Sequence, residues 1–139
     1  MRRLIALIIV GMLTLSIAPA LAQTEGGVDI VPIGTYEMGL FDEGAQEIGA
    51  YDPVSQRLFV TNADADSVDI LDISDPTTPT LITSITFEDY GDSVNSVDVY
   101  DSVVAVAVEA EDVDANGFVV FMDTDGTEIG AVEAGVLPD

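Results

Sequence analysis

Val68-Asp69-Ile70-Leu71-Asp72 recurs 51 positions later as Val119-Val120-Phe121-Met122-Asp123. Two shorter segments return after 49 and 45 positions: Ala50-Tyr51-Asp52 as Val99-Tyr100-Asp101, and Leu58-Phe59-Val60 as Val103-Val104-Ala105. A period near fifty residues, built from four short strands, is typical of the blades of a β-propeller. The sequence therefore predicts an all-β protein that contains about two four-stranded antiparallel blades.

The first blade is expected at about residues 47–87, because turn residues divide this region into four apolar runs. Asp52-Pro53 opens the first turn and Ser74-Asp75-Pro76 opens the third, where Pro fixes φ and Asp or Ser hydrogen-bonds the backbone. The predicted strands are Glu47–Tyr51, Arg57–Asn62, Ser67–Ile73 and Thr80–Phe87.

The second blade is expected at about residues 96–133, and Asp125-Gly126 forms its last hairpin turn. Within it, Val103–Val108 alternates Val with Ala, which predicts an inner strand that is buried on both faces between neighbouring blades. The predicted strands are Ser96–Asp101, Ser102–Glu109, Gly117–Asp123 and Thr127–Glu133.

Short segments flank the two blades. Residues 23–29 are polar and contain Gly, which predicts a flexible lead-in. Ile30–Tyr36 resembles the outer strand Leu81–Phe87 and is expected to form a further short strand. Residues 135–139 are interpreted as the start of a third blade, so that residues 30–139 make up a partial propeller.

The N-terminal residues 1–22 have the pattern of a secretory signal peptide. Arg2 and Arg3 precede an apolar run from Leu4 to Ile17, and Ala20-Leu21-Ala22 supplies the small residues that signal peptidase requires. The apolar run is shorter than the roughly 20 residues that span a bilayer. We expect cleavage after Ala22 and a secreted protein, extracellular or periplasmic.

The charge of the expected mature chain is extreme. Loss of the leader leaves a single basic residue, Arg57, against 26 acidic ones, a net charge of −25. Such a chain repels nucleic acid and anionic membranes, so neither is an expected partner. Two explanations stay open, namely a general adaptation to a saline habitat and the binding of cations or of a cationic surface partner.

The residue types that the mature chain lacks narrow its chemistry. It has no His, no Cys and no Lys, and therefore no general base near neutral pH, no thiolate and no amine for Schiff-base chemistry. No disulfide compensates for a small core. We therefore predict no catalytic residues in this chain and no certain cofactor, although calcium, which binds oxygen ligands, stays a candidate.

The third turn carries a family signature. Asp72–Pro79 reads Asp-x-Ser-Asp-Pro-x-x-Pro and resembles the propeller repeats that are named for their LVIVD motif. The wider pattern is similar to the N-terminal part of the choice-of-anchor I family of secreted bacterial propellers, which implies a seven-bladed fold with further blades and a surface anchor beyond this chain. The matching stretches are Gly34–Glu37, Gln46–Ile48, Asn95–Val97, Ala105–Ala110 and Leu137–Asp139.

Three functions agree with these features. The first is a non-catalytic binding module in the N-terminal part of a secreted, surface-associated propeller. The second is the N-terminal part of a calcium-dependent, phosphatase-like extracellular hydrolase whose catalytic residues lie in further blades. The third is a structural surface protein that calcium stabilises.

Strand order places many acidic residues at one end of the blades. In a propeller blade, the loop between the second and third strands and the connection to the next blade lie on one face, which usually carries ligands. The acids in these loops are Asp42, Glu43, Asp64, Asp66, Glu88, Asp89, Asp92, Glu109, Glu111, Asp112 and Asp114. We expect them to form an acidic rim that holds cations or a cationic partner, unless they merely reflect the acidity of all the loops.

One of these loops matches the start of a calcium-binding motif. Asp112-Val113-Asp114-Ala115-Asn116-Gly117 fits D-x-[DN]-x-[DN]-G, in which alternate side chains converge on one ion. Asp123 occupies the twelfth position, but a strand between Gly117 and Asp123 would hold it away from the loop. Asp112, Asp114 and Asn116 are therefore candidate ligands of a weak calcium site, and a plain Asn-Gly hairpin turn is the alternative.

Overall fold

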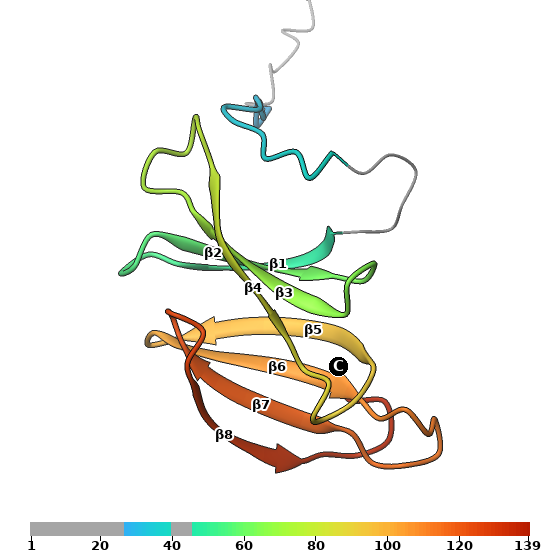
Figure 1. Cartoon of the computed structure of the whole chain (residues 1–139). Coiled ribbons are helices and arrows are strands. Elements are labelled where there is room, and N and C mark those ends of the chain that lie inside the picture. The colour runs from blue at the N-terminus through green and yellow to red at the C-terminus, as the bar shows by residue number, and fades with distance from the viewer. Residues whose placement is uncertain (1–26, 40–45) are drawn as a thin grey trace, which may run out of the picture. The chain divides into compact units, whose positions relative to one another are not determined.

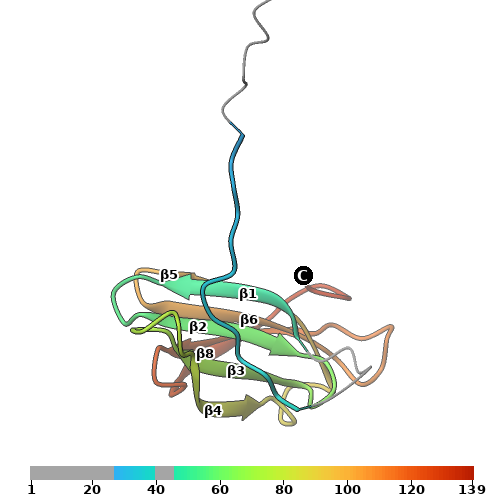
Figure 2. The same ribbon diagram turned by 90° about the horizontal axis from the view of Figure 1, so that it is seen from above.

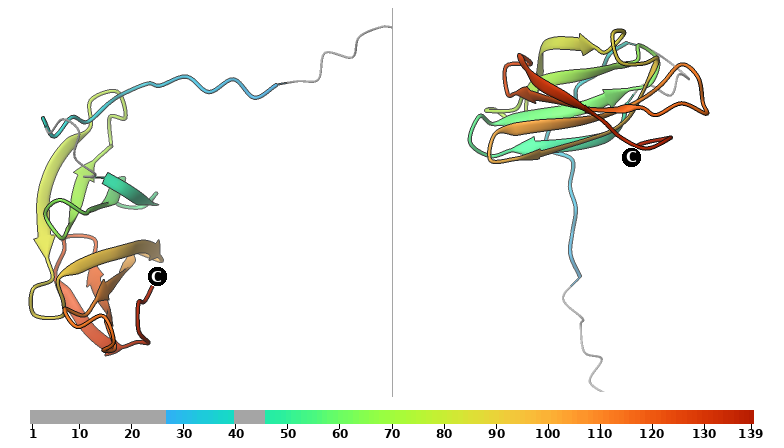
Figure 3. Two further views of the ribbon diagram at one scale, coloured as in Figure 1. Left: turned by 90° about the vertical axis from the view of Figure 1, so that its right-hand side faces the viewer. Right: turned by 90° about the horizontal axis from the view of Figure 1, so that it is seen from below.

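The chain forms two four-stranded antiparallel sheets, stacked one beside the other (Figures 1 and 3). The computed structural model describes residues 27–39 and 46–139. The predicted leader and the predicted rim acids Asp42 and Glu43 lie outside these residues. Both sheets belong to the compact unit Val31–Asp139, and residues 27–30 of the preceding unit have no secondary structure.

All eight strands predicted for the two blades are present. The first sheet has the order β1-β2-β3-β4, with β1 at Gln46–Asp52, β2 at Arg57–Asn62, β3 at Ser67–Asp72 and β4 at Thr80–Thr86. The second sheet has the order β5-β6-β7-β8, with β5 at Ser93–Tyr100, β6 at Val103–Glu109, β7 at Phe118–Asp123 and β8 at Glu128–Glu133. Sequential antiparallel order is the arrangement expected of propeller blades.

The segment Ile30–Tyr36 was wrongly predicted to be a strand. Residues 31–39 cross the first sheet without joining a backbone ladder (Figure 2). Gly34 packs so closely on the turn before β4 that a Cβ atom would lie 2.1 Å from the carbonyl oxygen of Pro76. At the other end, the sulfur of Met38 accepts a long contact from the amide of Asn62 at 3.9 Å. An extended segment becomes a strand only when a neighbour pairs with its backbone.

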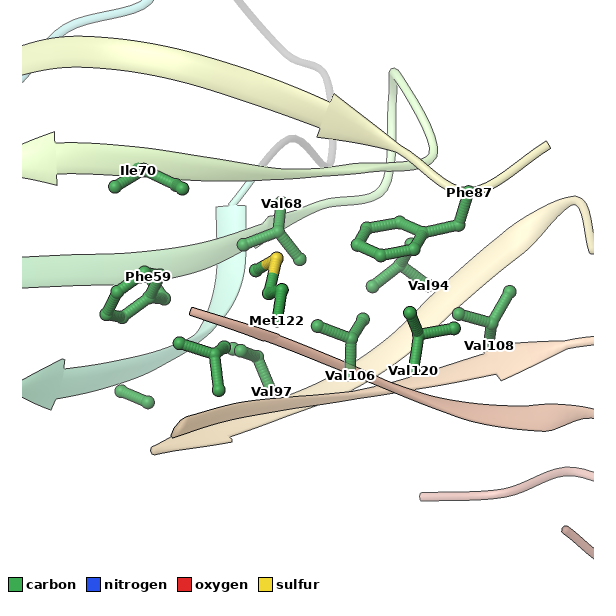
Figure 4. Packing of buried hydrophobic residues seen from close by; sticks show 12 residues of the cluster. Phe59, Val68, Ile70, Phe87, Val94, Val97, Val106, Val108, Val120 and Met122 are labelled. Atoms are coloured by element: carbon green, nitrogen blue, oxygen red, sulfur yellow. The ribbon is translucent and has the colours of Figure 1, made fainter. Parts of the chain in front are cut away.

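The hydrophobic core lies between the two sheets (Figure 4). In the first sheet, Phe59 pairs with Ala50 and Ile70, and all three side chains are buried. In the second, Val106 pairs with Val97 and Val120 in the same way. Phe87 comes from the β4–β5 connection and fills the space between the sheets beside Val94 (Figure 4). Burial of these facing surfaces is the main force that joins the two blades.

Register irregularities show how the two blades correspond. The ladder shifts between Gln46 and Gly49 in β1 and between Val94 and Ser96 in β5, and again at Ile70/Leu71 and Phe121/Met122. With these shifts aligned, equivalent residues of the third strands, β3 and β7, are 51 positions apart, as the sequence repeat indicated. Equivalent residues are 48 rather than 49 positions apart in the first strands, and 46 rather than 45 positions apart in the second strands. The sequence alignment of the first two strands was therefore wrong by one residue. Because successive side chains of a strand point to opposite faces, an alignment error of one residue matches core residues to residues on the opposite face.

The corrected correspondence explains how the blades stack. Phe59 and Ile70, which face the second sheet, correspond to Ala105 and Phe121, which face away from the first sheet. Each sheet therefore presents the same face in the same direction, as consecutive blades of a propeller do. In β6, Val104, Val106 and Val108 enter the core, while on the other face Val103 stays 40% exposed. The expectation of burial on both faces holds only in part.

Polar contacts join the two sheets at the end opposite to the predicted acidic rim. The carboxylate of Asp52, only 3% exposed, accepts hydrogen bonds from Ser55 N at 2.8 Å and Ser55 Oγ at 2.6 Å. Ser102 Oγ of the second sheet adds a weaker contact at 3.4 Å. Arg57 donates to the carbonyl oxygen of Thr124 and lies 2.6 Å from Asp125, both in the β7–β8 turn.

We expect Met122→Ala to lower the free energy of unfolding by about 2–5 kcal/mol, because it empties a site between the sheets that is 1% exposed. Urea unfolding followed by circular dichroism measures this loss. Ile129→Ala in the adjacent strand is the matched control, since Ile129 is 63% exposed, and we expect a change of about 0.5 kcal/mol or less. Equal losses in the two variants would contradict the assignment of the core.

The hydrogen bonds from Ser55 lower the pKa of Asp52 below its usual 3.8. A depressed folded-state pKa stabilises the fold above pH 3.8, and this contribution disappears as the pH falls through the folded-state pKa. The stability gap between the wild type and Asp52→Asn should therefore be widest at neutral pH and shrink below about pH 4. Unfolding measurements from pH 7 to pH 2 test this, and Ser55→Ala should reduce the gap in the same way. A gap that does not vary with pH would refute the assignment.

Candidate functional site

Acidic side chains surround a cavity of about 450 Å³ at one end of the two blades. Asp66 comes from the β2–β3 turn, Glu88, Asp89 and Asp92 come from the β4–β5 connection, and Glu111 follows β6. We call this space the acidic cavity. All five carboxylates are exposed to solvent. The connection order of the blades thus brings together acids from three separate loops.

The β4–β5 connection is held in place by its backbone. Tyr90 N donates to Phe87 O at 2.8 Å, and Asp92 N donates to Glu109 O at 3.2 Å. Gly91 lies so close to β6 that a Cβ atom would be 1.8 Å from the carbonyl oxygen of Glu109. Only glycine permits this approach, and it fixes Glu88, Asp89 and Asp92 at the rim of the acidic cavity.

Tyr90 links the acidic cavity to the second sheet. Its ring packs against Phe118 with centroids 5.4 Å apart and a tilt of 58°. Its hydroxyl donates a hydrogen bond of 2.7 Å to Glu128 Oε1. This bond is the main cause that raises the pKa of the Tyr90 phenol; partial burial and the charges of Glu128 and Asp89 raise it further. The phenol therefore stays protonated and orients the Glu128 carboxylate.

A smaller pocket of about 190 Å³ adjoins the acidic cavity and shares Thr86, Glu88, Asp89 and Tyr90 with it. We call it the floor pocket. Its apolar lining comes from both sheets, and Glu128 stands at its edge. The apolar residues that line it are Ile85, Phe87, Val120 and Met122. Its apolar side chains can contact the hydrocarbon part of an organic ligand, and its carboxylates can fix the polar groups of that ligand.

No basic side chain in the described residues neutralises the acidic cavity. Arg57, the one basic residue among residues 27–39 and 46–139, is engaged with Thr124 and Asp125 at the opposite end of β2. Uncompensated carboxylates around a concave surface focus a negative potential that attracts cations. The arrangement therefore suits a positively charged ligand.

The predicted acidic rim is reproduced only in part. Glu109 lies outside the lining of the acidic cavity, because its carboxylate accepts a hydrogen bond from Asn95 at 3.4 Å and its carbonyl holds Asp92. Asp64, Asp112 and Asp114 do not line the acidic cavity either. Asp42 and Glu43 lie outside the described residues. The sequence analysis did not identify Tyr90 and Glu128 as site residues. The one signal that could have identified Tyr90 is its position as an aromatic residue between the acidic Asp89 and Asp92.

A buried polar cluster on the outer face of the first sheet also escaped the sequence analysis. Asp69, 1% exposed, accepts hydrogen bonds from Ser84 Oγ at 2.5 Å, Gln46 Nε2 at 3.2 Å and Asn62 Nδ2 at 3.3 Å. Asn62 Oδ1 and Ser67 Oγ are buried beside it without a partner among the described residues. In the corrected correspondence, Asp69, Asn62 and Ser67 take the places of the apolar Val120, Val108 and Phe118.

Comparison with known protein families agrees with this architecture. Residues 47–139, which comprise nearly all of both sheets, match the choice-of-anchor I domain. The chain belongs to the choice-of-anchor I family. The match confirms the choice-of-anchor I resemblance that the wider sequence pattern had indicated. No curated protein matches the chain.

Choice-of-anchor domains are typical of secreted or cell-surface proteins, which agrees with the exported location expected from the sequence. Within the described part of this choice-of-anchor I chain, no helix is long and apolar enough to cross a bilayer. The predicted cleavage site after Ala22 lies outside that part. Membership of the family agrees with a secreted or cell-surface location and names no ligand.

The calcium candidates lie together in the loop before β7 of this choice-of-anchor I domain. Asp112 Oδ1 accepts a hydrogen bond from Asp114 N at 3.1 Å, while Asn116 Nδ2 donates to Glu133 at 2.8 Å. Asp123 lies at the far end of β7, away from the loop, as the sequence had indicated. Its carboxylate accepts hydrogen bonds from the N–H groups of Asp125 and Thr127. In residues 27–39 and 46–139, no group of three or more acidic side chains converges as metal ligands would. The calcium site stays a prediction.

If Asp112, Asp114 and Asn116 bind calcium, calorimetry should detect a dissociation constant of about 1 mM, which is typical of extracellular modules. The double variant Asp112→Ala with Asp114→Ala should abolish this heat signal. Glu37→Gln with Asp101→Asn removes the same charge from exposed positions away from the loop and serves as the control. Calcium binding that survives in the first double variant would exclude this loop as the site.

Proposed function

We propose that the protein is a secreted, surface-associated binding module without catalytic activity, released by cleavage after Ala22, whose acidic cavity binds a cationic partner. The observation that carries the proposal is the convergence of five carboxylates from three loops on one cavity. The family membership supports the location of such a module at the cell surface.

The composition of the cavity supports binding over chemistry. Its lining contains carboxylates, one phenol, one threonine, and otherwise Ala65 and Gly91. The phenol of Tyr90 already donates to Glu128, and its raised pKa keeps it from acting as a base near neutral pH. The remaining groups attract and orient a cation but offer no activated nucleophile.

The positions of the carboxylates around the acidic cavity indicate what kind of cationic partner fits it. The carboxylates surround a cavity of about 450 Å³ and do not converge on a point, so several separate positive groups fit them better than one small ion. A basic segment of another polypeptide at the cell surface has this distribution of charge. Electrostatic attraction of this kind accelerates association and weakens as salt rises.

Binding of a decalysine peptide, followed by fluorescence anisotropy at low and moderate salt, tests the proposal. The triple variant Glu88→Gln, Asp89→Asn, Glu111→Gln should weaken binding by about tenfold, because three exposed charge pairs are lost. The control is Glu37→Gln, Glu47→Gln, Asp101→Asn, which removes the same charge from exposed residues outside the cavity. Equal weakening by both triple variants would show that net charge, and not the cavity, attracts the peptide.

A further inference from the structure

The acidic cavity and the floor pocket form one cleft, because they share four lining residues. The outer part of this cleft is acidic, and its inner part, the floor pocket, combines apolar side chains with the carboxylates of Glu88, Asp89 and Glu128. The inner part exists because the two sheets separate toward their outer strands. The backbone of β5 comes within 8 Å of β1, β2 and β3, whereas in the described part of the chain the backbone of β4 stays farther than 8 Å from the strands of the second sheet.

The separation forms the floor pocket between β4 and β7. Ile85 and Phe87 line one wall of the floor pocket, and Val120 and Met122 line the other. Phe87, Val120 and Met122 are otherwise almost completely buried, so the pocket opens directly onto the hydrophobic core. A ligand group that enters this space gains contacts with hydrocarbon on two sides.

Three carboxylates line the floor pocket together with these apolar residues. Glu88 and Asp89 come from the β4–β5 connection, and Glu128 comes from the start of β8. The hydroxyl of Tyr90 fixes one oxygen of Glu128, whose other oxygen accepts no hydrogen bond from the described residues. The floor pocket therefore offers acceptor oxygens beside apolar side chains.

We propose that the cleft takes a lysine side chain of a partner polypeptide, with its stem in the floor pocket and its ammonium group among Glu88, Asp89 and Glu128. This inference rests on the proposed function, and it adds the residue that the partner presents. Lysine carries a compact charge on a flexible four-carbon stem, which covers apolar surface while the charge stays at the polar edge. The alternative cation, arginine, gains most from stacking on an aromatic face. Here the ring of Tyr90 already packs on Phe118.

The test compares two decapeptides of equal length and charge at pH 6, one of lysine and one of diaminobutyrate, whose stem is two methylene groups shorter. We expect the lysine peptide to bind about tenfold more tightly, because only its stem reaches the floor pocket. Ile85→Phe should fill the pocket and lower the affinity for lysine to that for diaminobutyrate. Ile129→Phe, an exposed position outside the pocket, should leave both affinities unchanged.

A second variant guards against a folding defect in Ile85→Phe. Glu128→Gln changes an exposed side chain that lines the floor pocket and should weaken the lysine peptide more than the diaminobutyrate peptide. Equal affinities of the two peptides in every variant would overturn the inference and leave the proposed function intact, whereas no binding of either peptide would overturn both. Tighter binding of an arginine decapeptide than of decalysine would also overturn the choice of lysine.

Discussion

The structure depends on the burial of one apolar face of each sheet against the other. Phe59 and Ile70 on one side, and Val106, Val120 and Met122 on the other, exclude water from the space between the blades. Phe87 belongs to the same core and anchors the β4–β5 connection. Since this connection carries Glu88, Asp89 and Asp92, the position of the acidic cavity follows from the packing of the core. A change in the angle between the sheets would alter the core, the floor pocket and the acidic rim together.

The two blades share a backbone plan but differ in the chemistry of equivalent faces. The second sheet turns Val108, Val120 and Phe118 toward its neighbour, and the first sheet has Asn62, Asp69 and Ser67 at the same positions. A buried carboxylate is tolerated there because three side chains donate hydrogen bonds to it. The segment Val31–Gly39 crosses this face, and the absence of a side chain at Gly34 permits its contact with Pro76.

The two ends of the blades differ in how their acidic side chains are compensated. At one end, Arg57 joins β2 to the β7–β8 turn, and Asp52 joins the first sheet to Ser102. At the other end, carboxylates face a cavity without a basic neighbour among the described residues. The repulsion among them opposes compactness, and salt or a bound cation relieves it. The cationic partner that we propose would relieve this repulsion on binding.

The sequence by itself determined the eight strands, their turns, the family and the loops that carry the acids. These features are local: turn residues such as Asp125-Gly126 and alternating apolar residues act over a few positions of the chain. Tertiary structure alone decided which face of each strand enters the core. An alignment error of one residue matches the core residue Phe59 to Val104 instead of Ala105, and these two residues lie on opposite faces of β6. It also decided that Ile30–Tyr36 is not a strand, since a ladder needs a partner from elsewhere in the chain. The cleft required both sheets, because Phe87, Tyr90, Met122 and Glu128 meet only through contacts between residues far apart in the sequence.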